Sequence, residues 1–145
     1  KPEEQDDVIY SYHKKLFHSD EGEQTKFARA WTEWESALAT MGSKNTGGIT
    51  PAAYARAFAR IENHYFINKG FLNKDDIILS NMYKIDQIPG TIIHGRYDMI
   101  CPPLSAFKLH NAWEASKLHI IKNAGHSLSE EGISSALVSV MDNLI

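Results

Sequence analysis

The sequence is poor in cysteine, in long apolar runs and in charge of one sign. Its single cysteine, Cys101, excludes an internal disulfide and favours a reducing compartment such as the cytoplasm. The apolar runs are only a few residues long, so none is expected to span a membrane. The 145 residues carry a formal net charge of -3, with both signs dispersed. We therefore expect neither a nucleic acid nor a membrane as partner.

Metal ligands are also scarce in this sequence. One cysteine cannot build a multi-cysteine site, and no two of the seven histidines are four residues apart, as in a helical zinc motif. His94, on or just after a predicted strand, is interpreted as a core residue with its polar atoms satisfied. We expect no metal and no cofactor.

The first half has the apolar period of helices. Apolar residues recur at three- and four-residue intervals, which predicts three amphipathic helices at about residues 4–17, 24–41 and 51–70. In the second of these, Trp31 and Trp34 are both expected to face a core. Thr50 is the predicted N-cap of the third helix, with Pro51 at its first position and Gly70 at its end.

The second half changes to short, β-branched apolar runs. Strands are predicted at residues 91–94 and 118–121, with a helix after Pro102 and Pro103 between them and a last helix at about 134–144. A strand, helix and strand in this order predict parallel neighbours. Two parallel strands alone make a poor sheet, so further strands must come from elsewhere. The alternative is a small α+β domain in which these strands pair with segments interpreted here as helical.

Each predicted strand leads to a loop with one ionisable residue, Asp98 after the first and His126 after the second. An acid followed by a histidine is the order of the last two members of an α/β-hydrolase triad. Asp98 would accept a hydrogen bond from one ring nitrogen, leaving the other as a base. Alone, Asp98 is better interpreted as a turn acid that caps the helix near Pro102; its pairing with His126 favours catalysis. No Gly-x-Ser-x-Gly elbow occurs in these 145 residues.

Several motifs resemble those of proline iminopeptidases, which are α/β-hydrolases with a helical cap. His94-Gly95-Arg96-Tyr97-Asp98 is shared by many α/β-hydrolases, whereas Trp34-Glu35 combined with Arg60-Ile61-Glu62-Asn63-His64-Tyr65-Phe66 is more specific. The other segments that carry the resemblance are residues 12–13, 30–33, 59, 101–102, 112–113, 118–120 and 124–127. The resemblance covers nearly the whole chain.

The resemblance implies a role for four residues and a division of the chain. Asp98 corresponds to the triad acid and His126 to the triad base, and Glu35 and Glu62 correspond to the cap carboxylates that bind the free amino group of an N-terminal proline. Residues 1–74 would form part of the helical cap. Residues 75–145 would form the last strand-helix-strand-helix unit of the parallel sheet, so the fold class is α/β, a partial α/β-hydrolase fold.

The same resemblance implies that part of the enzyme is absent. The oxyanion segment and the serine elbow of the family precede the cap, and neither occurs here, so the chain is expected to be the C-terminal half and inactive by itself. The predicted function is a serine-type aminopeptidase that releases N-terminal proline, with a peptide substrate and the missing N-terminal half as partners.

Other interpretations of the sequence remain. Another α/β-hydrolase, such as an epoxide hydrolase, esterase or dehalogenase, would share Asp98 and His126, and a non-catalytic fragment could bind a partner. Cys101 is better interpreted as a packed side chain than as a thiol nucleophile. Ser127 and Ser129 fit the capping of a final helical turn better than they fit nucleophiles.

Overall fold

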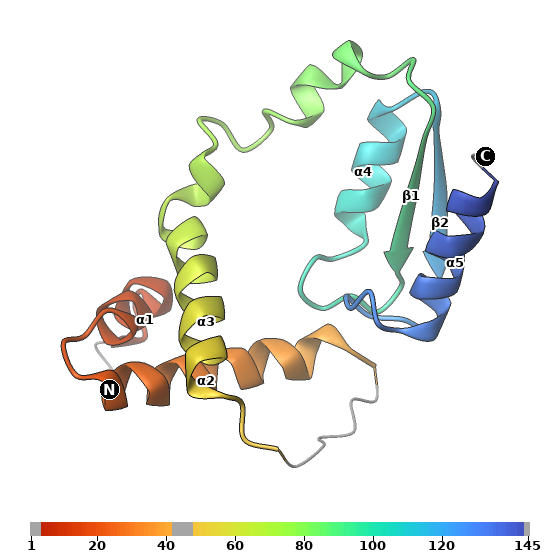
Figure 1. Cartoon of the computed structure of the whole chain (residues 1–145). Coiled ribbons are helices and arrows are strands. Elements are labelled where there is room, and N and C mark those ends of the chain that lie inside the picture. Colours follow the sequence, from red (N-terminus) through yellow and green to blue (C-terminus); the bar gives the residue numbers. More distant parts are fainter. Residues whose placement is uncertain (1–3, 42–47, 144–145) are drawn as a thin grey trace. The chain divides into compact units, whose positions relative to one another are not determined.

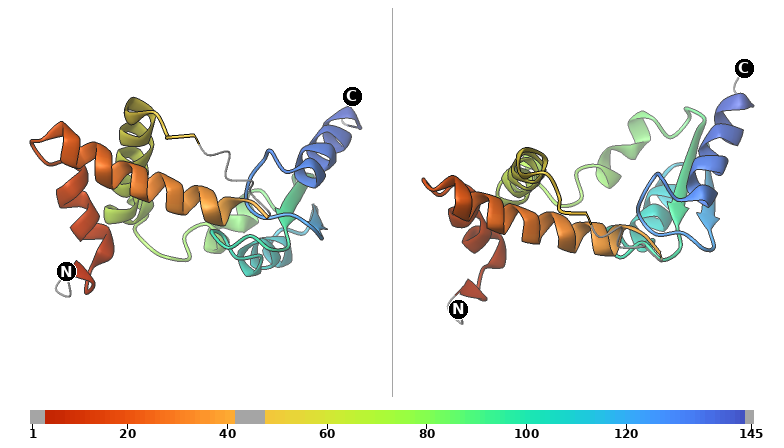
Figure 2. Two further views of the ribbon diagram at one scale, coloured as in Figure 1. Left: turned by 90° about the horizontal axis from the view of Figure 1, so that it is seen from below. Right: turned by 60° about the horizontal axis from the view of Figure 1, so that its bottom comes forward.

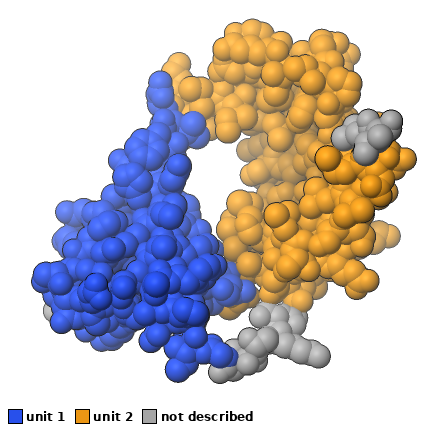
Figure 3. Space-filling view, viewed as in Figure 1, with its two compact units in different colours: residues 1–36, 45–73 blue, residues 37–44, 74–145 orange. Residues whose placement is uncertain are grey.

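The computed structural model describes residues 4–41 and 48–143. The chain forms two compact units (Figure 3). Unit 1 comprises residues 1–36 and 45–73, and unit 2 comprises residues 37–44 and 74–145. In the described part of the chain, no helix has the length and apolar character needed to cross a membrane.

Unit 1 is helical, which confirms the three predicted helices (Figure 1). Their bounds are α1 (Val8–Leu16), α2 (Glu21–Ala39) and α3 (Ala52–Ile67). Helix α1 begins later than predicted because Asp7 is its N-cap and accepts the Tyr10 N–H at 2.9 Å. Pro51 rather than Thr50 occupies the N-cap position of α3, and no side chain caps that end. After α3, a 3-10 turn, η2 (Lys69–Phe71), contains Gly70 with a left-handed φ of 62°.

The core of unit 1 lies where the three helices meet. Trp31 is 6% exposed and packs with Leu16 and with three alanines, Ala28, Ala55 and Ala59. Trp34 is 62% exposed, so the prediction that it faces a core was wrong. The buried residues of α2 form a narrow stripe, and Trp34 lies about 100° around the helix from its centre. Small alanines bring the helices together over this stripe alone.

A buried asparagine joins α1 to α3. The fully buried Asn63 donates from Nδ2 to the Ile9 carbonyl oxygen at 2.9 Å. Its Oδ1 therefore accepts, and the His13 Nδ1–H donates to it at 2.9 Å. Arg60 adds a third link from α3, because its Nε donates to the carbonyl oxygen of Leu16 at the end of α1. Polar groups of α1 are thus satisfied by side chains of α3.

Unit 2 is an α/β arrangement built on a small parallel sheet. Its elements are the 3-10 helix η3 (Leu79–Lys84), β1 (Gly90–Gly95), α4 (Leu104–Ala112), β2 (Ser116–Ile121) and α5 (Glu131–Asp142). The two strands pair in parallel with Gly90 opposite Ser116 and Gly95 opposite Ile121, which confirms the predicted parallel pairing. Helices α4 and α5 lie on opposite sides of the strands (Figures 1 and 2).

The strands pair with each other and not with the segments interpreted as helical, which disfavours the α+β alternative. Among the described residues the sheet has two strands. Helix α5 starts at Glu131, three residues before the prediction, and the predicted end at residue 144 lies outside the described residues.

Replacing Asn63 should destabilise unit 1 strongly. Asn63→Ala leaves the Ile9 carbonyl and the His13 ring N–H without their partner in a partly buried place, and it opens a cavity at the fully buried position 63, which should lower the free energy of unfolding by about 2–4 kcal/mol. Urea unfolding measures the change. The matched control is Asn68→Ala, because the Asn68 side chain is exposed and donates to the carbonyl oxygen of the nearby His64, one turn earlier in the same segment. An Asn63→Ala loss no larger than the control's would contradict the linking role.

Candidate active site

The candidate site lies in unit 2, at the carboxyl ends of β1 and β2. Because the strands are parallel, both ends lie at the same edge of the sheet. The Arg96 N–H donates to the Ile121 carbonyl oxygen at 2.9 Å, which extends the pairing by one step beyond β1. The Tyr97 N–H then donates to the Ala124 carbonyl oxygen at 2.9 Å. These bonds hold the loop of Asp98 directly against the loop of His126.

The two loops approach so closely that residue 95 must be glycine. A Cβ atom added to Gly95 would lie 1.9 Å from the Gly125 carbonyl oxygen and 2.6 Å from that of Ala124. Both neighbours are backbone atoms, so a side-chain movement cannot relieve the overlap. The close approach places the loop before His126 over the end of β1.

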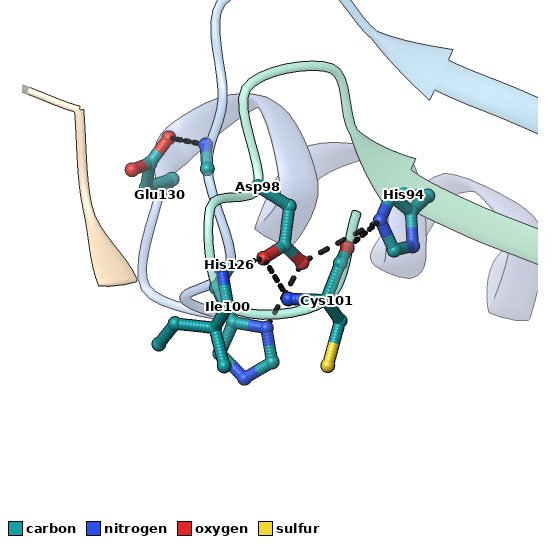
Figure 4. A network of polar contacts seen from close by, with 7 residues as sticks. His94, Asp98, Ile100, Cys101, His126 and Glu130 are labelled. Atoms are coloured by element: carbon teal, nitrogen blue, oxygen red, sulfur yellow. Dashed lines mark hydrogen bonds and ion pairs between the residues drawn. The ribbon is translucent and has the colours of Figure 1, made fainter. Parts of the chain in front are cut away.

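Asp98 and His126 form a hydrogen-bonded pair. The His126 Nδ1 lies 2.9 Å from Asp98 Oδ2 (Figure 4). The Asp98 side chain is 4% exposed, whereas that of His126 is 42% exposed. An ionised carboxylate only accepts hydrogen bonds, so neutral His126 carries its proton on Nδ1 and keeps a free electron pair on Nε2. The pair is therefore arranged as an oriented base on an exposed ring and a buried acid behind it.

The second oxygen of Asp98 organises its own turn. Asp98 Oδ1 accepts the Ile100 N–H at 3.0 Å and the Cys101 N–H at 2.7 Å. Asp98 is thus a turn acid as well as the partner of His126, but the helix-capping part of the first interpretation was wrong. It does not cap α4, whose N-cap position is Pro103.

His94, which the sequence analysis interpreted as a core residue with its polar atoms satisfied, is a member of this cluster. Its Nε2 lies 2.8 Å from the Cys101 carbonyl oxygen and 3.5 Å from Asp98 Oδ2 (Figure 4). A carbonyl oxygen only accepts, so Nε2 carries the proton and points it toward both oxygens. His94 therefore holds the turn from Asp98 to Cys101 from the side of β1. The spacing of four residues between His94 and Asp98 was the signal in the sequence that could have indicated this contact.

The environment of Asp98 favours its charged form. Burial by itself raises the pKa of this carboxyl, because the charge is removed from water. The hydrogen bonds from the Cys101 N–H, the His126 ring and the Ile100 N–H, with the charge of His126, outweigh burial and hold the pKa below its usual range. Asp98 is therefore ionised wherever the base beside it can act.

The loop of His126 is held from the other side by the last residue of α2, Ala39. The Ala39 carbonyl oxygen accepts the His126 N–H and the Ser127 N–H, both at 2.8 Å. Glu130, which the sequence interpretation did not single out, accepts the Gly125 N–H at 2.8 Å. Ser127 and Ser129 bond to each other, and neither caps α5. The expected helix-capping role of these two serines was therefore wrong.

The two predicted binding carboxylates, Glu35 and Glu62, lie in unit 1. Glu35 is 6% exposed and sits at the centre of the buried stripe of α2, one turn after Trp31. Glu62, on α3, accepts the indole N–H of Trp31 on Oε2 at 2.5 Å. Trp31 thus brings Glu62 to the face of α2 that carries Glu35. Within the described residues, no group of three His, Cys, Asp or Glu side chains is arranged to hold a metal.

Comparison with known proteins matches these observations to one group. No protein-family model matches the chain. A probable proline iminopeptidase of Leptolyngbya boryana is 41% identical over 146 residues, which cover 99% of this chain and 46% of that protein. Proline iminopeptidases of Arabidopsis thaliana (46% identical over 133 residues) and Xanthomonas citri (41% over 143) cover 90% and 97% of the chain.

The resemblance that the motifs indicated is therefore confirmed: over nearly its whole length, the chain is similar to proteins named proline iminopeptidase. It spans less than half the length of these relatives, namely 46%, 35% and 46%.

A side chain at position 95 should separate the two loops of the site. Gly95→Ala places a methyl group against two backbone carbonyls and should cost about 3 kcal/mol or more of unfolding free energy. The control is Gly48→Ala, where nothing lies within 4 Å of an added Cβ. Thermal unfolding of both variants gives the comparison. Equal stability of the two would contradict the close approach.

Asp98 should make stability depend on pH in acid. The folded-state pKa is below the unfolded value of about 3.9, so the folded state binds fewer protons. Its contribution is present above about pH 4 and is lost as the pH falls through the folded pKa. The stability difference between wild type and Asp98→Asn, measured by urea unfolding, should therefore shrink in acid. Asp75→Asn, at an exposed position, is the control; a pH-independent difference for Asp98→Asn would contradict the shift.

Proposed function

We propose that the polypeptide that carries this chain is a serine-type aminopeptidase that releases N-terminal proline from peptides. The observation that carries the proposal is the pair of Asp98 and His126, joined at 2.9 Å at the ends of adjacent parallel strands. The similarity to proteins named proline iminopeptidase supports the substrate class. We infer that the protein acts without a cofactor or a metal, and in the cytoplasm.

His126 would act as the general base and then as the general acid. Its Nε2, free of the bond to Asp98, accepts the proton of a serine hydroxyl as the oxygen attacks the amide carbon. The same proton is then delivered to the leaving amine. Asp98 keeps the ring in the required tautomer and stabilises the imidazolium that forms. Burial of Asp98 strengthens this interaction, because little water screens it.

The serine of this triad would lie outside the 145 residues. A base and an acid cannot replace the nucleophile, because all three take part in one covalent step. The chain alone is therefore expected to be inactive. In this proposal unit 2 is the last part of an α/β-hydrolase core, and its two strands pair with further strands from the missing N-terminal half. Unit 1 is part of the helical cap.

Glu35 and Glu62 would recognise the charged imino group of the terminal proline. A carboxylate shielded from water attracts an ammonium ion more strongly than an exposed carboxylate does. Glu35 is 6% exposed, and the Trp31 indole N–H holds Glu62 on the neighbouring helix, which supports a pair of ordered acids. Such a pair would select substrates whose amino terminus is free and protonated.

Neutralising either acid should remove the preference for N-terminal proline. In the natural polypeptide that contains this chain, Glu35→Gln and Glu62→Gln should each lower kcat/KM for a proline anilide by about 30-fold or more. The reason is that the charged imino group of the bound substrate loses a carboxylate partner. Glutamine at position 62 can still accept the Trp31 N–H, so the fold should survive. Hydrolysis of a simple nitrophenyl ester, which has no amine, should hardly change.

The matched control is Glu33→Gln, because Glu33 lies on α2, the helix of Glu35, and is exposed. Full proline release by both glutamine variants would favour another α/β-hydrolase, such as an esterase, epoxide hydrolase or dehalogenase. The sequence that precedes Lys1 provides a second test. If it contains no serine elbow, the non-catalytic alternative, a fragment that binds a partner, replaces this proposal.

A further inference from the structure

Glu130 occupies the N-cap position of α5 and does not cap that helix. Its backbone is extended, and its side chain makes no hydrogen bond to the first turn of α5. The carboxylate turns back along the chain, where Oε2 accepts the Gly125 N–H at 2.8 Å (Figure 4). Oε1 accepts the Met41 N–H at 2.6 Å. The short side chains of Ser, Thr, Asp and Asn are the ones that cap their own helix from this position; the longer glutamate side chain binds N–H groups of other segments instead.

One of the two N–H groups that Glu130 binds belongs to the loop of His126, and the other belongs to the segment that holds this loop. Gly125 directly precedes His126, and Met41 lies two residues after Ala39, whose carbonyl oxygen accepts the His126 and Ser127 N–H groups. Three hydrogen bonds therefore join residues 39–41 to residues 126–130, and a fourth joins Gly125 to Glu130. Two of these four bonds end on Glu130. Bonds to an ionised carboxylate are stronger than those between neutral groups.

The backbone before His126 has little room to move while these bonds are present. A Cβ atom added to Gly125 would lie 3.0 Å from the Ala39 carbonyl oxygen and 3.4 Å from Glu130 Oε1. The His126 ring itself is 42% exposed. The orientation of the ring therefore depends on the backbone of His126 and on the hydrogen bond to Asp98, rather than on tight packing. A shift of the Gly125 peptide would move the ring relative to Asp98.

We propose that Glu130 is a positioning residue for His126: it clamps the Gly125 peptide to residues 39–41 and so holds the imidazole in line with Asp98. Glu130 touches no reacting group and acts through the loop. The kinetic consequence of the clamp rests on the proposed aminopeptidase function. The structural consequence, an ordered bond between His126 and Asp98, does not.

The test removes one of the two acceptors without changing the shape of the side chain. In Glu130→Gln, the amide oxygen can accept one N–H, but the amide nitrogen then faces the other N–H as a second donor. In the natural polypeptide, kcat for a proline anilide should fall about 10- to 100-fold, because misplacing a catalytic group by about 1 Å has effects of this size. KM should stay within about twofold, since Glu130 does not contact the substrate.

A direct readout of His126 accompanies the kinetics. The proton on Nδ1, bonded to Asp98, gives a low-field proton NMR signal that should weaken or broaden in Glu130→Gln. The control is Glu131→Gln, which removes the same charge from the adjacent, exposed position. It should leave kcat and the low-field signal unchanged. A purely stabilising role would lower the melting temperature of Glu130→Gln without changing the signal in the folded protein.

Three outcomes would overturn the proposal. One is a Glu130→Gln protein with the kcat and the NMR signal of Glu131→Gln. Another is a fall in kcat matched by an equal rise in KM with an unchanged signal. The third needs no variant and applies even if Glu130→Gln fails to fold: the Gly125 amide of the wild type exchanges with solvent as fast as an unbonded amide. Absence of proline release by the wild type would contradict the aminopeptidase function alone, because the NMR signal and the exchange still test the clamp.

Discussion

The close approach of two loops over Gly95 is the constraint on which the candidate site depends. Parallel strands place their carboxyl ends side by side, but side-by-side ends are not sufficient for a bond between an acid and a base. The loop before His126 must lie over the end of β1, and its carbonyl oxygens come within 1.9 Å and 2.6 Å of the place where a Cβ atom would be. Only a residue without a side chain permits this arrangement. The 2.9 Å bond between Asp98 and His126 follows from it.

Carboxylates organise both units, and each does so through N–H groups. Asp98 gathers two backbone N–H groups and a ring N–H, Glu130 gathers two backbone N–H groups, and Glu62 accepts an indole N–H. In Asp98 and Glu130 each carboxylate oxygen has a donor in place of water. The lowered pKa of Asp98 is the electrostatic consequence. In each case the acid orders a neighbouring group as well as itself.

The proposed chemistry divides between groups that react and groups that hold them. His126 would transfer the proton and Asp98 would orient it, whereas His94 and Glu130 would hold the turn and the loop from which these two residues project. This support matters for function because a base on a loop is placed accurately only if the loop has one conformation. His94 and Glu130 each lie four positions from Asp98 or His126 in the sequence. His94 acts through the Cys101 carbonyl, and Glu130 acts through the Gly125 and Met41 N–H groups.

The sequence by itself determined the helical period of the first half, the two short strands and their parallel pairing, and the pair of Asp98 and His126. These depend on local pattern and on connection rules, which a single chain displays directly. Only the tertiary structure decided that Trp34 is exposed, that Asn63 joins α1 to α3, and that Glu130 turns away from its own helix. The partners of these residues lie up to 89 positions away. A periodicity cannot report such partners, because packing and hydrogen bonds between distant segments are chosen only when the chain has folded.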